Sequence, residues 1–161
     1  MAIVGIRAVL AIVGYQAWLG QARTASTKDL VQLLSYGQTA YYEDTEGYLS
    51  CSGGYASLYP RQPNDKKHTL HDPAHADFRC WRLLAPEDDS PTYASFAAVA
   101  GNPGEAMTAP PLDTDVTGPV PAGRPWYVIL AVADQDADGE RAYWATTSLA
   151  PNIVYSQDEY E

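Results

Sequence analysis

MAIVGIRAVLAIVGYQAWL, the stretch from residue 1 to residue 19, carries one charged side chain, Arg7, and places apolar residues on every face of a helix. Such a helix is buried all round, either in lipid or among other helices. The stretch is slightly shorter than the roughly 20 residues of a bilayer span. Because it is apolar from its first residue, we expect the true beginning of the helix to be missing. Arg7 costs about 2.5 to 3.5 kcal/mol at the centre of a span, but near an end its guanidinium reaches the interface.

The helical pattern continues beyond residue 19 and becomes amphipathic. One stripe recurs at steps of three and four residues: Leu19, Ala22, Ser26, Leu30, Leu33, Gly37 and Ala40. This stripe is expected to pack on the rest of the protein. The helix should end near Glu46, with Gly47 as a left-handed cap. A helix from residue 2 to about residue 44 is about 65 Å long at 1.5 Å per residue, so residues 1–19 should protrude and residues 20–46 should pack on a head.

Residues 47–161 read as that head, and it should be rich in β-structure. All 12 prolines of the chain lie in it, and proline breaks helices because it lacks an N–H group. The segments 48–91 and 102–125 read as loops. The strand candidates, of which the last two should form an antiparallel hairpin, are residues 93–100, 126–133 and 141–147. The fold class is therefore α+β, with one long N-terminal helix packed on a small antiparallel sheet.

The helix and the sheet should meet through apolar side chains. Leu30, Leu33 and Leu34 are expected to be buried against the strand at residues 126–133. Side chains alternate between the two faces of a strand. The three leucines should therefore face one of two sets: Trp126, Val128, Leu130 and Val132, or the residues that alternate with these four. Because a buried, unpaired carboxylate is costly, a Leu33→Asp change is expected to unfold the head.

Composition narrows the function. The chain has 20 acidic and 10 basic side chains, a formal net charge of −10. This charge repels polyanions and disfavours nucleic acid as a partner. The sequence offers no nucleotide-binding loop, catalytic triad or paired-carboxylate site that would support an enzyme. The two cysteines, Cys51 and Cys80, fit one disulfide if the protein is exported and two inert thiols if it is not.

Two groups of residues are candidate cation ligands. Asp134, Asp136 and Asp138, followed by Gly139, form D-x-D-x-D-G, the start of a calcium loop with carboxylates on alternate residues. An EF-hand is excluded because Ala145 occupies the twelfth position and a strand follows. A calcium site in a hairpin turn and a solvated acidic turn both remain. The second group, a zinc candidate whose spacing also fits a solvated loop, comprises His68, His71, Asp72, His75 and Asp77.

Both ends of the chain resemble the type IV pilin and pseudopilin family. Residues 36–48, YGQTAYYEDTEGY, are similar to the end of the family's N-terminal helix. Residues 131–144, AVADQDADGERAYW, resemble the last hairpin of many pilins, and residues 152–161 resemble their acidic tail. Four further stretches resemble the interior of the family's N-terminal helix: residues 2–6 (AIVGI), 8–12 (AVLAI), 15–16 (YQ) and 21–23 (QAR).

The resemblance implies a structural protomer of a type IV pilus, with a pseudopilin of a type II secretion system as the alternative. Before assembly the N-terminal helix would lie in the inner membrane. It would then form the core of a helical filament of identical subunits, extracellular as a pilus or periplasmic as a pseudopilus. Some pseudopilins bind calcium near the last hairpin, and no other cofactor is implied. The assembly helix would comprise Ile3, Val4, Ile6, Val9, Leu10, Ile12 and Val13.

The sequence also departs from the family. The basic leader, the processing site and the buried glutamate of the mature helix have no counterpart in it. Val13 stands where proline is common, and Arg7 stands where an apolar residue is usual. The glycines Gly5, Gly14 and Gly20 either permit close helix packing or are weak helix positions. The main rival is a secreted binding module with a retained signal-like helix, in which residues 20–22 are a small-x-small cleavage site.

Overall fold

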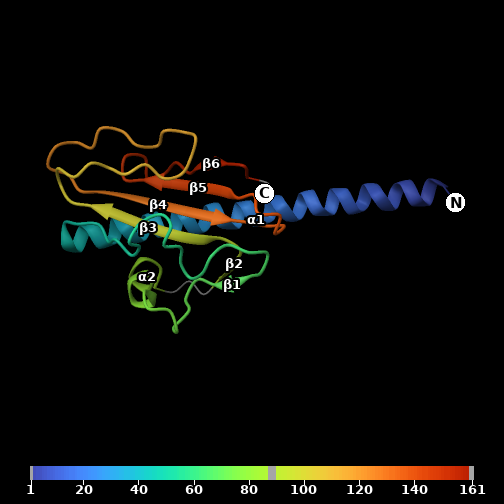
Figure 1. The fold of residues 1–161 in the computed structure, drawn as a ribbon, viewed down its shortest axis with the longest axis horizontal. Helices are drawn as coiled ribbons and strands as arrows, with labels where there is room; N and C mark the ends of the chain where they lie inside the picture. Colours follow the sequence, from blue (N-terminus) through green and yellow to red (C-terminus); the bar gives the residue numbers. More distant parts are fainter. Residues whose placement is uncertain (1, 87–89, 160–161) are drawn as a thin grey trace.

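A single long helix and a small antiparallel sheet make up the protein (Figure 1). The computed structural model describes residues 2–86 and 90–159, without the side chains of residues 2–13, 16 and 17. Helix α1 spans Ala2–Thr45, 44 residues, which corresponds to about 66 Å. Its C-terminal part lies against the sheet, and its N-terminal part extends well beyond the head (Figure 1). The mixed fold class and the protruding helix agree with the sequence analysis.

The main sheet has four antiparallel strands in the order β3-β4-β5-β6. Their bounds are Ser95–Gly101 for β3, Trp126–Ala133 for β4, Ala142–Thr147 for β5 and Tyr155–Gln157 for β6. The predicted hairpin is confirmed, since β4 and β5 pair from Ala133↔Ala142 to Val128↔Thr147. Residues 51–59 cover the edge of the sheet that β3 forms, and they hydrogen-bond to β3 through Ala98 and Phe96.

The segment that the sequence analysis assigned to a loop holds three further elements. Strands β1 (His68–Thr69) and β2 (Pro91–Thr92) form a two-stranded sheet, and helix α2 spans Phe78–Leu84. Helix α2 packs on α1 at Gly37, where a Cβ atom would lie 1.9 Å from the carbonyl oxygen of Leu84. The absence of a side chain at Gly37 therefore permits the two helices to approach this closely.

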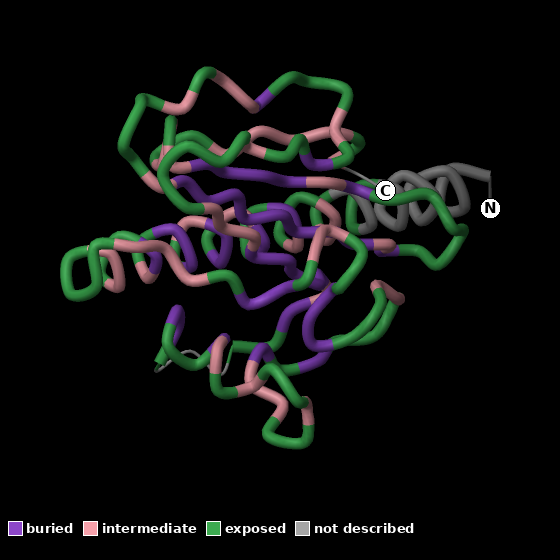
Figure 2. Tube along the Cα trace, turned by 60° about the vertical axis from the view of Figure 1, so that its left-hand side comes forward, coloured by how far each residue is buried: buried purple, intermediate pink, exposed green. Residues whose placement is uncertain are grey.

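The core lies between α1 and one face of the main sheet (Figure 2). Strand β4 is buried along its whole length. The face toward α1 carries Tyr127, Ile129, Ala131 and Ala133, which share one cluster with Leu30, Val31 and Leu34. Of the two sets that the sequence left open, the one that faces α1 is therefore the set that alternates with Trp126, Val128, Leu130 and Val132. Leu130 and Val132 belong to a second cluster, with Leu58, Ala97 and Ala145.

The predicted stripe of α1 is wrong in its orientation. Leu30 and Leu34 are buried as expected, but Leu33 is 36% exposed, and Ala22, Ser26 and Ala40 are exposed. The stripe that packs on the head is instead Thr24, Thr27, Leu30, Val31, Leu34, Ser35 and Gln38. Four of these seven residues are polar, and a polar group is buried at little cost when it is hydrogen-bonded. A pattern based on apolar residues alone therefore selected a neighbouring face.

The C-terminal end of α1 also differs in detail from the prediction. The helix ends at Thr45, and Glu46, with φ 59°, is the residue in the left-handed conformation. The backbone N–H of Glu46 donates to the carbonyl of Tyr42 at 2.8 Å and closes the last turn. Gly47, the predicted cap, lies one residue beyond it.

Candidate functional site

The part of α1 that extends beyond the head is the first candidate site. The predicted assembly residues, Ile3, Val4, Ile6, Val9, Leu10, Ile12 and Val13, lie outside the side chains that the structure describes. Among the described residues, no helix has the length and apolar character needed to cross a bilayer. Tyr15 and Trp18 are described; their rings stack at 6.1 Å between centroids, and each side chain is 60% exposed.

The exposed aromatic residues continue along the same side of α1. Tyr36 is 59% exposed, and Leu33 lies beside it. With about 100° between successive residues, Tyr15, Trp18, Leu33 and Tyr36 fall within a sector of about 60°, roughly opposite Gln38. We call these four residues the outer face of α1. The head does not cover these four side chains, which form two exposed pairs with the charged Asp29 between them on the same side. Exposed aromatic and aliphatic groups on one side of a helix are candidates for an interface.

The inner face of α1 is fixed to the head by hydrogen bonds of its polar residues. The hydroxyl groups of Ser35 and Tyr127 lie 2.7 Å apart. Burial raises the pKa of Tyr127 to about 12, and the hydrogen bond with Ser35 opposes this shift. Gln38 binds both backbone groups of Leu49, because its Nε2 donates to the carbonyl at 2.6 Å and its Oε1 accepts from the N–H at 2.9 Å. These contacts satisfy polar groups that burial would otherwise penalise.

A second set of contacts holds α1 where it leaves the head. Arg23 Nη1 donates to the carbonyl of Gln135 at 3.0 Å, and Thr24 Oγ1 donates to the carbonyl of Glu159 at 2.7 Å. Lys28 Nζ forms an ion pair with Glu159 Oε1 at 2.7 Å. Hydrogen bonds from Lys28 and Ser156 lower the pKa of Glu159. The C-terminal segment and the turn after β4 are thus tied to the same two turns of α1.

A small pocket of about 180 Å³ lies beside these contacts, between α1 and strand β2. Two cations line it and share one aromatic ring: the Arg23 guanidinium lies 4.2 Å from the centroid of Tyr93, and Lys67 Nζ lies 5.4 Å from it. Ser26, Thr27 and Thr92 add hydroxyl groups, and Leu19, Ala22 and Pro91 complete the lining. We call this the Arg23–Lys67 pocket. The sequence analysis missed it because its three charged or aromatic residues are far apart in the chain.

The acidic turn between β4 and β5 brings its three aspartates together. Asp134, Asp136 and Asp138 each place a carboxylate oxygen within 4.8 Å of the others. Two left-handed residues, Ala137 at φ 63° and Gly139 at φ 95°, curl the backbone around them. Asp134 Oδ1 is buried and has no hydrogen-bond partner among the described residues. Oxygen ligands in this arrangement suit a hard cation such as calcium. The three carboxylates thus lie as close together as the D-x-D-x-D-G pattern predicts.

The histidines do not form a comparable group. The described residues contain one cluster of three possible ligands, the aspartates of the acidic turn. Both ring nitrogens of His68 face backbone carbonyls, those of Lys66 and Ala94, and burial lowers the pKa of this side chain. His71 bonds to the carbonyl of Ala85, and His75 packs edge-on against Tyr59. The alternative of a zinc site is therefore set aside in favour of histidines that support the loop.

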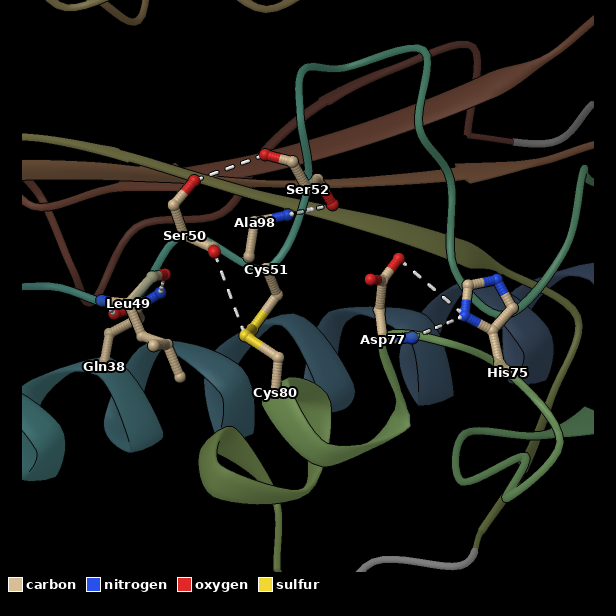
Figure 3. Close-up of a disulfide and its surroundings, with 9 residues drawn as sticks. All are labelled: Gln38, Leu49, Ser50, Cys51, Ser52, His75, Asp77, Cys80 and Ala98. Atoms are coloured by element: carbon tan, nitrogen blue, oxygen red, sulfur yellow. Dashed lines mark hydrogen bonds and ion pairs between the residues drawn. A yellow bond between two sulfur atoms is a disulfide. The ribbon is translucent and has the colours of Figure 1, made fainter.

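Cys51 and Cys80 form the predicted disulfide (Figure 3). It joins the segment after α1 to helix α2, and Cys80 Sγ lies 3.8 Å from the carbonyl of Ser50. Gln38 of α1 lies beside it through its bonds to Leu49 (Figure 3). The disulfide thus closes the side of the core that α2 covers, where Tyr59 and Trp81 stack at 4.9 Å.

Comparisons with known proteins identify no relative. No protein-family model, no curated protein and no solved structure matches the chain. The case for a function therefore depends on the two faces of α1, the Arg23–Lys67 pocket and the acidic turn.

Proposed function

We propose that the chain is a structural subunit of a type IV pilin-like filament that assembles through α1. The observation that carries the proposal is the outer face of α1. Trp18 is 60% exposed and Tyr36 is 59% exposed, although both are large and apolar. Exposed aromatic residues on one side of a helix are typical of a surface that another protein covers. In a filament, the outer faces of neighbouring subunits cover one another.

The segment of α1 beyond the head supports the same function. Residues 1–19 are apolar on every face and contain one charge. Before assembly this segment would lie in the inner membrane, and in the filament it would lie among equivalent helices. Since lipid is as apolar as the filament core, close helix packing and not hydrophobic transfer would drive this step. The head would then face outward, with its acidic surface toward solvent.

Two other functions fit the same features, one within the pilin-like class and one outside it. A secretion pseudopilus uses the same assembly and differs in location, and the acidic turn is compatible with both. A secreted binding module with a retained signal-like helix would use the outer face for a different protein. A filament subunit and a secreted binding module differ in one property: the filament subunit associates with its own copies.

The test is electron microscopy of filaments sheared from cells that express the full-length chain. We expect Trp18→Asp, Tyr36→Asp and Ile12→Asp to reduce filaments at least about tenfold, since each places a charge in a subunit contact. Leu83→Asp is the matched control, because Leu83 is 58% exposed and belongs to α2 and not to the outer face of α1. It should leave filaments at the parent level.

Circular dichroism of each purified variant shows whether the head remains folded. A parent chain that forms only monodisperse particles would exclude the filament and favour the binding module. Filaments that persist in both aromatic variants would exclude the outer face as the contact. A chain that lacks residues 1–19 is expected to be a folded monomer that does not polymerise.

A further inference from the structure

The Arg23–Lys67 pocket holds two cations without a local counter-charge. Within the part of the chain that the structure describes, neither Arg23 nor Lys67 has a carboxylate oxygen within 4.0 Å. Lys28, one turn further along α1, does have one, since it pairs with Glu159. Arg23 stacks on Tyr93 and uses one N–H group for Gln135, which leaves further guanidinium donors for another partner.

The size and the lining of the pocket select the class of ligand. A volume of about 180 Å³ accepts a side chain but not an extended molecule. Cations and hydroxyl groups bind carboxylates, and Arg does so with two parallel hydrogen bonds. The hydroxyl of Ser26, on an exposed residue of the lining, adds a donor. The pocket therefore fits the end of an acidic side chain.

The opposite end of the head supplies acidic side chains that lack a cation. Glu43 and Asp44 lie in the last turn of α1, followed by Glu46, and all three are exposed. That turn contains no basic residue. Acidic groups are unfavourable there, because the C-terminal end of a helix already carries partial negative charge. Arg124 acts electrostatically on the neighbouring Tyr48, yet no described cation lies within 4.0 Å of these carboxylates.

We propose that the Arg23–Lys67 pocket of one copy binds the acidic C-terminal end of α1, Glu43 or Asp44, of a second copy. This inference rests on the proposed function and adds the partner residues of one subunit contact. The two sites are 20 residues apart on one helix, about 30 Å, so one copy cannot join them itself. A contact between different surfaces of identical subunits produces a filament when the rotation between neighbours does not close a ring.

The acidic turn bears on the strength of this contact. Arg23 bonds to Gln135, which stands between Asp134 and Asp136. Among the described residues no carboxylate oxygen of the turn lies within 4.0 Å of Arg23, but a calcium ion bound there would change the charge beside the pocket. The experiment is therefore carried out at one fixed calcium concentration.

Charge exchange in the full-length chain tests the contact. Lys67→Glu is expected to reduce sheared filaments at least about tenfold, and so is the pair Glu43→Lys with Asp44→Lys. All three substitutions together should restore filaments to within about threefold of the parent, because opposite charges meet again. Lys66→Glu is the matched control: Lys66 is exposed and adjacent, but it does not line the pocket. It should leave filaments unchanged.

Disulfide cross-linking gives a readout that does not depend on filament yield. Cys51 and Cys80 are already bonded to each other, so Lys67→Cys with Glu43→Cys introduces the two reactive thiols. Oxidation of these filaments should give a ladder of covalent oligomers. Arg82→Cys with Glu43→Cys should give none, because Arg82 is an exposed basic residue outside the pocket.

The outcomes separate this inference from the proposed function. A parent chain without filaments contradicts the proposed function itself. Filaments at the parent level in Lys67→Glu, together with no ladder, contradict only the contact proposed here. If Lys67→Glu instead weakens retention of the full-length chain on phosphatidylglycerol vesicles but not on phosphatidylcholine vesicles, and filaments are unchanged, the pocket binds a lipid headgroup and the contact is wrong.

Discussion

The inner and outer faces of α1 differ in the residues that each one buries or exposes. The inner face, which packs on the sheet, includes Thr27, Ser35 and Gln38, each at most 2% exposed. The outer face, which the head leaves open, carries Trp18 and Tyr36. An amphipathic helix normally buries its apolar side and exposes its polar side. The inner face of α1 departs from this pattern only in part, because its buried polar residues lie beside Leu30, Val31 and Leu34. The exposed aromatic residues of the outer face are the feature on which the proposed assembly contact depends.

The two faces also differ in how they achieve specificity. Polar residues on the inner face have fixed partners, such as Tyr127 for Ser35 and Leu49 for Gln38. Hydrogen bonds of this kind define one register between helix and sheet, because a displaced helix would leave them unpaired. The outer face has aromatic residues, which give contact area without demanding one exact partner geometry. This difference suits a permanent contact on one side and an assembly contact on the other.

The largest expected difference comes from adjacent leucines on the two faces. Leu34→Asp should abolish folding, since Leu34 is 0% exposed and a buried carboxylate costs at least about 4 kcal/mol. Leu33→Asp should cost at most about 1 kcal/mol, which corrects the expectation from the sequence. Thermal melting of both variants measures the difference. Equal destabilisation would mean that the two faces are not distinct in solution.

A pair of glycines on α1 provides the next test. Gly37→Ala should destabilise the head by about 3 kcal/mol, because the added Cβ would meet the carbonyl of Leu84 at 1.9 Å and displace α2. Gly14→Ala should not destabilise the head and can gain up to about 1 kcal/mol of helix propensity, since no described atom outside the adjacent helix backbone lies within 4 Å of the added Cβ. Urea denaturation gives both values. An unchanged midpoint for Gly37→Ala would refute the close packing of α2 on α1.

The third test uses pH and addresses the polar contact of the inner face. The pKa of Tyr127 is raised by burial from 10 to about 12. A raised pKa stabilises the folded protein fully below pH 10, and this contribution is lost as pH rises from 10 to 12. At 1.36 kcal/mol per unit the loss is about 2 to 3 kcal/mol.

The change that isolates this contribution is Tyr127→Phe. It should cost about 1 kcal/mol at pH 7, because the hydrogen bond to Ser35 is lost. It should also flatten the loss of stability above pH 10, which chemical denaturation at several pH values measures. A slope as steep as that of the parent would assign the alkaline loss to other tyrosines, such as Tyr48, whose pKa is also raised by burial.

Much of the head was predictable from the sequence, and the reasons are local. Strand β4, Trp126–Ala133, is a continuous run of β-branched, aromatic and small apolar residues, and a short acidic turn separates it from β5. Such runs predict strands with little ambiguity. Helix α2 was missed because its seven residues lie in a region rich in turn-forming residues, and its position depends on the disulfide and on Gly37.

The inner face and the pocket could not be predicted for a different reason. Apolar residues occur on both sides of α1, so periodicity alone does not reveal which side the head covers. Ser35 and Gln38 are suited to burial only through Tyr127 and Leu49, and the partner of Ser35 is 92 residues away. The Arg23–Lys67 pocket likewise forms only when α1 and β2 meet. Information of this kind is in the tertiary contacts and not in any local stretch.

The smallest expected effect concerns the acidic turn, which is attached to α1 through Arg23 and Gln135. Asp134, Asp136 and Asp138 converge, and within the described part of the chain the buried Asp134 Oδ1 has no hydrogen-bond partner. A cation at this turn would pair that oxygen and fix the end of the hairpin against α1. Since a ligand that binds only the folded state stabilises it by mass action, calcium at tenfold its Kd adds about 1.4 kcal/mol.

We therefore expect calcium to raise the melting temperature of the head by about 3 to 5 °C relative to chelator. Asp136→Asn should remove this response while preserving the turn, because the asparagine oxygen can still accept from the N–H of Asp138. Glu140→Gln is the control, since it makes the same change of charge on a residue outside the three aspartates. Magnesium should have a smaller effect, because it requires a stricter octahedral site. A melting temperature that does not respond to calcium would leave a solvated turn, held to α1 by the Arg23 hydrogen bond without a metal ion.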